Sequence, residues 1–297
     1  MQVVPHVQTK TEIREVLDRH GIRPRKRHGQ HFLIDGNLMR RLAESAELSR
    51  EDAVLEIGPG TGGLTDLLLE SAGRVMAVEI DPAMQAILRE RFGQHGRFQL
   101  IAGDALAGKH HLAPGVVLAM EAAAKDGVRL KLVANLPYHA ATPALANLLV
   151  CPTPPDLLVF TVQKEVADRF TARAGSKDYG PLSVLFQVAC EVRQIAVVPP
   201  TAFWPVPDVE SAMLRCQRRS ESAGQRSTLA ELMVLVHGAF AYRRKTLRQN
   251  LRRSLGPEEL ARAEAEFDLD RRAEELSVAE WVALTDSIHS ARRLQKS

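Results

Sequence analysis

The chain has 297 residues, of which 45% are hydrophobic, so it can bury a substantial core and form one large domain plus a smaller one. Its three cysteines are far apart and lack a C-x-x-C pair, which argues against a disulfide framework or a zinc motif and favours a reducing cytoplasm. No apolar run approaches the roughly 20 residues that cross a bilayer, and no signal-peptide core is seen, so we expect a cytoplasmic protein without a membrane partner. The net charge of +3 conceals basic runs near both ends, which hint at a polyanionic partner.

Residues 1–24 carry scattered apolar side chains among many charges, which predicts an N-terminal tail with a short helix. The basic run Arg25-Lys26-Arg27 follows and leads to Gln30, His31 and Leu33. Such a run is often a solvated surface. The alternative that we prefer is a phosphate-contacting loop that leads into a ligand site.

The stretch Val54–Leu64 organises the chain, because an apolar run there ends in glycines that open an amphipathic segment. This order predicts a buried strand, a tight turn and a helix start. Glycines suit the turn because they reach positive φ cheaply and leave the backbone bare for a ligand. Gly58, Gly60 and Gly63 satisfy the dinucleotide-binding spacing. Gly58, Gly60 and Gly62 instead satisfy the tighter glycine spacing of methyltransferases. The remaining alternative is a glycine turn that binds no ligand.

Two further predicted strands, over residues 74–81 and 98–105, end near Glu79 and Asp104. In α/β nucleotide-binding folds, an acid about 20 residues after the glycines bonds the ribose hydroxyls, and Glu79 has this spacing. Asp104 is suited to an adenine amino group. Either acid alone could instead cap a helix or turn, but ligands of open α/β sheets bind at these strand ends.

The fourth predicted strand ends in Asn135-Leu136-Pro137-Tyr138, which is either a simple turn or a site for an amine. An adenine amine is a poor nucleophile because its lone pair is delocalised into the ring. The side-chain oxygen of Asn135 and the carbonyl of Leu136 could each accept one N–H and hold the lone pair toward an electrophile. Pro137 would fix that carbonyl, and Tyr138 would stack on a base removed from its helix.

Residues 105–131 have the character of an insertion with a helix over 117–125, and we interpret its His110-His111 pair as a surface feature rather than metal ligands, so no metal is expected. Strands are predicted over 157–163, 192–198 and 212–216, and helices over 164–170 and 182–188. The proline-rich loop before the last strand contains Phe203. Its ring could wall a base pocket opposite Tyr138 or form a packing corner.

A polar stretch over residues 220–225 predicts a boundary between an α/β domain, residues 25–219, and an all-α domain, residues 226–297. A helix is predicted over residues 243–253 with leucines on one face. Its other faces carry Arg243, Arg244, Lys245, Arg248 and Arg252. The basic faces of this helix are either exposed to solvent or bind RNA. Glu-rich helices predicted over 257–266 and 273–287 have the character of scaffold.

In combination, these motifs resemble the ribosomal RNA small-subunit adenine dimethyltransferases. The matching segments are Arg25–Leu33, Glu56–Gly60, Glu79–Asp81, Gly103–Ala105, Asn135–Tyr138, Gln163–Ala167, Phe203–Ser211 and Arg243–Leu251. The resemblance implies a Rossmann-like seven-stranded class I methyltransferase sheet with a small all-α C-terminal domain. It also implies S-adenosylmethionine as methyl donor. The implied substrate is a pair of adjacent adenines near the 3′ end of 16S rRNA, each converted to N6,N6-dimethyladenine during ribosome biogenesis.

The resemblance also implies roles for single residues. Donor contacts fall on Gln30, His31, Leu33, Gly58, Gly60, Glu79, Asp104 and Asn135, and His31 stands where the family usually has Asn. The catalytic set is Asn135, Leu136, Pro137, Tyr138 and Phe203. The RNA contacts are Arg25, Lys26, Arg27, Arg243, Arg244, Lys245, Arg248 and Arg252, with the immature 30S subunit as partner of a monomer.

Three alternatives remain. An NAD-dependent oxidoreductase could use the same glycines and Glu79, but it has no use for Asn135-Leu136-Pro137-Tyr138. An antibiotic-resistance methylase of large-subunit rRNA would use identical chemistry, although the loop over 175–180 and the segment 243–247 favour the small-subunit branch. A non-catalytic ribosome-assembly or transcription factor could share the fold, but the intact Asn135 and Tyr138 argue against lost catalysis.

Overall fold

The computed structural model describes residues 7–23, 31–125, 127–219 and 225–295. The chain divides into two compact units. Unit 1 comprises Met1–Ala167 with Arg193–Arg218, and unit 2 comprises Asp168–Val192 with Arg219–Ser297. Residues 168–192 therefore group with the C-terminal helices rather than with the sheet domain, because α8 (Pro181–Ala189) packs on α9 (Gln225–Ala239).

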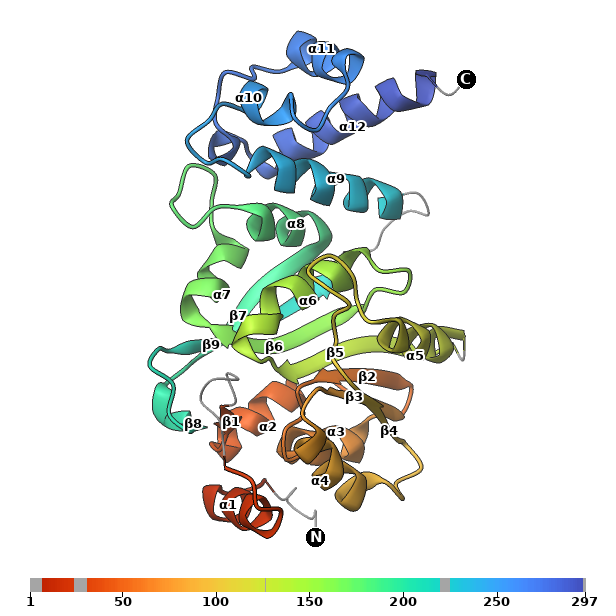
Figure 1. The fold of residues 1–297 in the computed structure, drawn as a ribbon, viewed down its shortest axis with the longest axis vertical. Coiled ribbons are helices and arrows are strands. Elements are labelled where there is room, and N and C mark those ends of the chain that lie inside the picture. Colours follow the sequence, from red (N-terminus) through yellow and green to blue (C-terminus); the bar gives the residue numbers. More distant parts are fainter. Residues whose placement is uncertain (1–6, 24–30, 126, 220–224, 296–297) are drawn as a thin grey trace. The chain divides into compact units, whose positions relative to one another are not determined.

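Within the described residues, a seven-stranded sheet has the order β4-β3-β2-β5-β6-β9-β7 (Figure 1). Its strands are β2 (Asp52–Ile57), β3 (Arg74–Glu79), β4 (Phe98–Ala102), β5 (Arg129–Asn135), β6 (Leu157–Gln163), β7 (Cys190–Val198) and β9 (Ser211–Arg218). The first five are parallel to their neighbours, and β9 is antiparallel to β6. This order confirms the predicted α/β methyltransferase sheet. The topological switch lies between β2 and β5, where ligands of such sheets bind.

The connecting helices cover both faces of the sheet. The helices α3 (Gly63–Ser71) and α4 (Pro82–Phe92) connect β2 to β3 and β3 to β4. The helices α5 (Pro114–Lys125) and α6 (Tyr138–Val150) connect β4 to β5 and β5 to β6, on the other side of β2 in the strand order. Right-handed crossovers place the two pairs on opposite faces, as Figure 1 shows. The helix α2 (Gly36–Glu44) shares one buried apolar cluster with α3 and α4, against strand residues such as Val54 and Val133.

The predicted N-terminal tail contains a well-defined helix, α1 (Lys10–Arg19). The hydroxyl of Thr9 accepts the main-chain N–H of Glu12, whose carboxylate in turn accepts the N–H of Thr9, so a capping box starts the helix. Its buried side chains, among them Ile13 and Leu17, pack against Met84 and other residues of α4. This part of the tail is therefore a packed element of unit 1.

A short two-stranded sheet and two small elements lie between the elements described above. These are β1 (Phe32–Leu33), paired with β8 (Phe203–Trp204), and α7 (Lys164–Thr171) and the 3-10 turn η2 (Pro200–Ala202). The pairing of β1 with β8 joins the segment before α2 to the proline-rich loop. No helix among the described residues is both long and apolar enough to cross a membrane.

Unit 2 is helical, but two predicted helices have different bounds. Besides α8 and α9, it contains α10 (Leu247–Leu251), α11 (Pro257–Glu266), η3 (Ala273–Glu275) and α12 (Val278–Gln295). The prediction of one helix over 243–253 was wrong, because Thr246 caps a new short helix and the Asn250 amide donates to the carbonyls of Ala239 and Tyr242. The helix predicted from 273 starts at Val278, after a capping box between Ser277 and Glu280.

Candidate active site

The glycine loop joins β2 to α3. Gly58, Gly60 and Gly62 have φ values of 73°, 59° and 87°, in the left-handed region that favours glycine. A Cβ atom at Gly60 would lie 2.8 Å from the Phe32 ring, and one at Gly62 would collide with the Phe92 ring, so space excludes side chains as well. The left-handed glycines therefore follow the methyltransferase spacing rather than the dinucleotide spacing.

Glu79 lies at the end of β3, directly beside this loop. Its carboxylate accepts the main-chain N–H of Gly60 at 3.2 Å and that of Asp81 at 2.8 Å. Burial raises the pKa of Glu79, and the two N–H donors offset part of that rise. The carboxylate is thereby held in one orientation and faces the cavity described below, where it can accept hydrogen bonds from a diol.

A second acid, Glu56, lies beneath the loop at the end of β2. It is 1% exposed and accepts a hydrogen bond from the hydroxyl of Thr65 at 2.7 Å. Burial raises the pKa of Glu56 to about 8, against the lowering effect of that hydrogen bond. Glu56 therefore takes up a proton at a higher pH than an ordinary glutamate. The motif match included this residue, but sequence reasoning gave it no role in the site.

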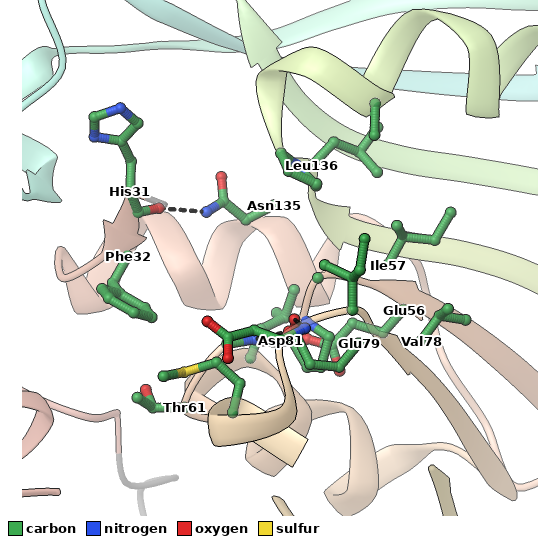
Figure 2. A pocket seen from close by; sticks show the side chains of 18 of the residues that line it. His31, Phe32, Glu56, Ile57, Thr61, Val78, Glu79, Asp81, Asn135 and Leu136 are labelled. Carbon is green, nitrogen blue, oxygen red and sulfur yellow. Dashed lines mark hydrogen bonds between the residues drawn. The ribbon is translucent and has the colours of Figure 1, made fainter. Parts of the chain in front are cut away.

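A cavity of about 370 Å³ opens at these strand ends (Figure 2). The predicted site residues that line it are His31, Leu33, Gly58, Gly60, Glu79, Asp104, Asn135, Leu136, Pro137 and Tyr138. They come from the ends of β2, β3, β4 and β5 and from β1, so one cavity joins motifs that are about 100 residues apart in the chain. Asp104 accepts the main-chain N–H of Leu106 at 3.0 Å, which fixes one of its oxygens in a turn.

Asn135, the last residue of β5, is held by two neighbours. Its side-chain Nδ2 donates to the main-chain carbonyl of His31 at 2.9 Å, the contact drawn in Figure 2. Its Oδ1 accepts a hydrogen bond from the hydroxyl of Thr161 on β6. The next residue, Leu136, is 2% exposed, and Pro137 is the N-cap of α6.

Tyr138 begins α6 and is oriented by contacts at its hydroxyl and at its ring. The hydroxyl lies 2.8 Å from that of Ser211, and the ring lies against the ring of His31 with centroids 5.4 Å apart and an interplanar angle of 28°. Burial raises the pKa of Tyr138, which keeps the phenol neutral. The His31 ring is anchored because its Nδ1 donates to the Pro205 carbonyl at 2.7 Å.

Phe203 does not face the cavity. Its side chain is 1% exposed and packs in the apolar cluster under α2 and α3, while its backbone pairs with Leu33. A ring this deeply buried cannot stack on a base, so the placement favours the packing corner over the predicted pocket wall. Its neighbour Trp204 stacks on Phe32 instead, with ring centroids 6.3 Å apart.

Sequence reasoning missed the contribution of the N-terminal segment. Gln8 and Ile13 line the cavity, and Oε1 of Gln8 accepts the hydroxyl of Thr61 in the glycine loop at 2.8 Å. The capping box at Thr9 and the helical spacing of Ile13 and Leu17 were visible signals of a packed helix. Nothing in the sequence indicated that it would pack beside the glycine loop.

The basic residues predicted to contact RNA divide into two groups in unit 2. Arg243 pairs with Glu274 at 2.8 Å, and Arg248 pairs with both Asp270 and Glu264. The second group consists of Arg244, Lys245 and Arg252, which are exposed, as is Arg243. Arg25, Lys26, Arg27 and Gln30 lie outside the described residues.

Comparison with known proteins agrees with this architecture. A family model described as ribosomal RNA adenine dimethylase matches residues 21–290. Ribosomal RNA small subunit methyltransferase A of Phenylobacterium zucineum is 41% identical over 281 residues, which cover 95% of this chain and 94% of the relative. The protein of the same name from Geobacillus sp. is 37% identical over 289 residues, covering 95% and 97%.

Solved structures share the fold. A dimethyladenosine transferase from Plasmodium falciparum superposes with a TM-score of 0.67 at 22% identity, covering 88% of this chain and 98% of its own. The 23S rRNA methyltransferase ErmE gives a TM-score of 0.58 at 26% identity, covering 87% and 99%. Since the family match spans residues 21–290 and both curated relatives align over 95% of the chain, the chain belongs to the ribosomal RNA adenine dimethylase family of S-adenosylmethionine-dependent methyltransferases.

Proposed function

We propose that the protein dimethylates N6 of two adjacent adenines near the 3′ end of 16S rRNA, acting as a monomer in the cytoplasm on an immature 30S subunit. The observation that carries this proposal is the amide of Asn135, held at the end of β5 on the rim of the glycine-loop cavity. The amide and the adjacent carbonyl of Leu136 provide two acceptors for the two N–H bonds of an adenine amine.

The cavity suits S-adenosylmethionine, which supplies an electrophilic methyl group when bound. Gly58 and Gly60 leave bare backbone beside it, and the Glu79 carboxylate can accept both ribose hydroxyls. Ile80 is 57% exposed and offers an apolar surface to the adenine ring of the donor, near Asp104. Leu33 and His31 line the cavity on the β1 side.

Transfer to the amine follows from the acceptor geometry. When Asn135 Oδ1 and the Leu136 carbonyl each accept one N–H, the nitrogen becomes pyramidal and its lone pair points toward the donor. Tyr138 stacks on the target base, and its hydroxyl contact with Ser211 fixes the plane of the ring. The aminium would lose its proton to water, and the donor's sulfur would leave as the neutral thioether, S-adenosylhomocysteine. Once a fresh donor has replaced it, the same site would take the monomethylated amine, whose single remaining N–H needs one of the two acceptors.

The rRNA is held through its backbone. Arg244, Lys245 and Arg252 are exposed in unit 2, and we assign phosphate contacts to these three and to the basic run Arg25-Lys26-Arg27. Arg243 and Arg248 are committed to ion pairs, so we assign them the role of fixing the segment that carries the exposed residues.

The decisive experiment maps methyl groups by mass spectrometry after incubation with labelled donor. Immature small subunits and naked 23S rRNA are offered separately, which distinguishes the small-subunit from the large-subunit reaction. We expect label on two adjacent adenines of the small subunit, and an Asn135→Ala variant should lose turnover far more than donor affinity because Asn135 acts in the transition state. Near-normal dimethylation by that variant would refute the mechanism.

A further inference from the structure

Thr161 is an unusual residue for its position. It is the only polar side chain among the six buried residues Leu157–Val162 of β6, and it is 0% exposed. A buried hydroxyl costs free energy unless it is hydrogen-bonded. Its partner is Oδ1 of Asn135, which lies directly opposite it in the β5–β6 register. The Thr161 hydroxyl is therefore hydrogen-bonded to Asn135, the residue to which the proposed reaction assigns the adenine amine.

The contacts of Asn135 determine which way its amide points. The main-chain carbonyl of His31 can only accept, so the group that faces it at 2.9 Å must be Nδ2. Oδ1 then faces Thr161, whose hydroxyl donates to it. A flipped amide would set two oxygens against each other at His31, so the two neighbours select the same orientation.

We propose that Thr161 is a positioning residue that, with the His31 carbonyl, holds the Asn135 amide with its oxygen available to the adenine amine. An amide oxygen has two lone pairs, so one remains for an N–H of the substrate after Thr161 has donated to the other. If the amide flipped, its NH₂ group would face the amine, and two donors would oppose each other. This inference rests on the proposed role of Asn135.

The predicted effect is moderate, because the His31 carbonyl alone still favours the same orientation. Loss of one neutral hydrogen bond that orients the acceptor corresponds to a fall in kcat of about two- to tenfold. The KM for the subunit and the Kd of S-adenosylmethionine should change by less than about twofold, since Thr161 lies behind Asn135 rather than against either ligand.

The test uses three variants of the full chain. Thr161→Val removes the hydroxyl at nearly constant volume, and Thr161→Ser retains it. Thr285→Val is the matched control, because the Thr285 hydroxyl is also buried and donates to the main-chain carbonyl of Trp281 within α12. Single-turnover methyl transfer to immature small subunits gives the rate, and calorimetry gives donor affinity. NMR of the Asn135 side-chain amide measures its hydrogen exchange independently of activity.

We expect slower transfer and faster amide exchange only in Thr161→Val, with Thr161→Ser and Thr285→Val near the parent values. Unchanged exchange in Thr161→Val would overturn the inference, whether or not the enzyme is active. Equal losses in the Val and Ser variants would also overturn it, because they would indicate a packing role. Faster exchange with an unchanged rate would overturn the positioning role of Thr161 alone, because the His31 carbonyl still holds the amide and the catalytic role of Asn135 is tested by Asn135→Ala.

Discussion

Glu79 is the single residue through which donor binding can be tested most directly. The Glu79→Ala change should remove two hydrogen bonds from the ribose hydroxyls, each worth ~1.5–3 kcal/mol with a charged acceptor. The affinity for S-adenosylmethionine should therefore fall by about tenfold or more. Burial raises the pKa of Glu79, so its charge should be lost at a higher pH than that of an ordinary glutamate. Calorimetry should therefore find that donor affinity falls as the pH is lowered through this raised pKa.

Glu79→Gln is the control for the pH dependence. It keeps the shape of the side chain but has no titratable group, so its weaker donor binding should vary less over the same acidic range. An unchanged affinity in Glu79→Ala would remove this residue from the donor site. Tight binding of NAD in place of S-adenosylmethionine would contradict the assignment of the cavity.

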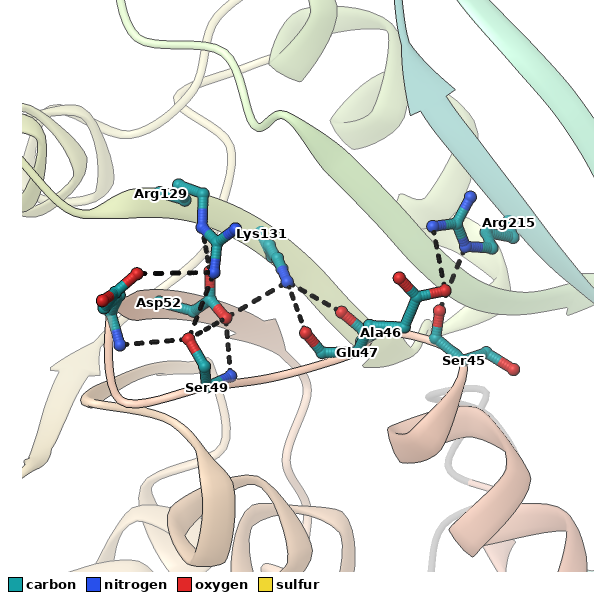
Figure 3. A network of polar contacts seen from close by, with 9 residues as sticks. Ser45, Ala46, Glu47, Ser49, Asp52, Arg129, Lys131 and Arg215 are labelled. Carbon is teal, nitrogen blue, oxygen red and sulfur yellow. Dashed lines mark hydrogen bonds and ion pairs between the residues drawn. The ribbon is translucent and has the colours of Figure 1, made fainter.

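The pairing of β2 with β5 depends on a buried ion pair at their amino-terminal ends (Figure 3). Lys131 donates to the Asp52 carboxylate at 3.1 Å and to the carbonyls of Ala46 and Glu47 at 2.9 Å each. Burial acts to raise the pKa of Asp52, but the N–H of Ser49 and the ammonium of Lys131 outweigh it, so the pKa is lowered. The strands that end at Ile57 and Asn135 are thus tied together at their opposite ends.

Lys131→Met should destabilise unit 1 by about 3–5 kcal/mol, because among the described residues it leaves the buried carboxylate with the half-exposed Arg129 as its one charged partner. Urea unfolding would measure the loss, and Asp52→Asn combined with Lys131→Met should recover part of it. Since the folded pKa of Asp52 is lowered, its contribution is full above the unfolded value and is lost as pH falls through the folded value. An equal loss in the single and double variants would contradict a buried-charge origin.

The elements of the sheet were predictable, whereas several contacts that complete the site were not. Apolar runs that end in glycine or in acid have a strong local signal, so the ends of β2, β3 and β5 followed from the sequence. The placement of α1 beside the glycine loop and the burial of Phe203 depend on packing between distant segments, which no local pattern encodes. Thr161 illustrates this, because only the register of β6 on β5 brings it to Asn135.

Arginine runs were the least predictable feature, because their role depends on which acidic side chains lie nearby. The predicted helix over 243–253 is instead a turn followed by the five-residue α10. Acidic residues 264, 270 and 274 form ion pairs with Arg243, which is itself exposed, and with Arg248, while Arg244, Lys245 and Arg252 are exposed. One sequence run therefore supplies both structural ion pairs and candidate phosphate contacts.

This division makes a prediction for binding of the whole ribosomal particle. The net charge of +3 is too small for strong non-specific binding of RNA, so the affinity for the subunit should depend on local clusters of basic residues. Neutralising Arg244, Lys245 and Arg252 together should reduce the slope of log affinity against log salt by about 2–3, because each lost phosphate contact removes ~0.7–0.9. Donor binding and thermal stability should stay unchanged.

Neutralising Arg243 and Arg248 instead should lower the melting temperature, because it leaves their acidic partners without a counter-charge. If the triple variant binds immature subunits with an unchanged salt slope, the exposed cluster does not contact phosphate and unit 2 acts as scaffold.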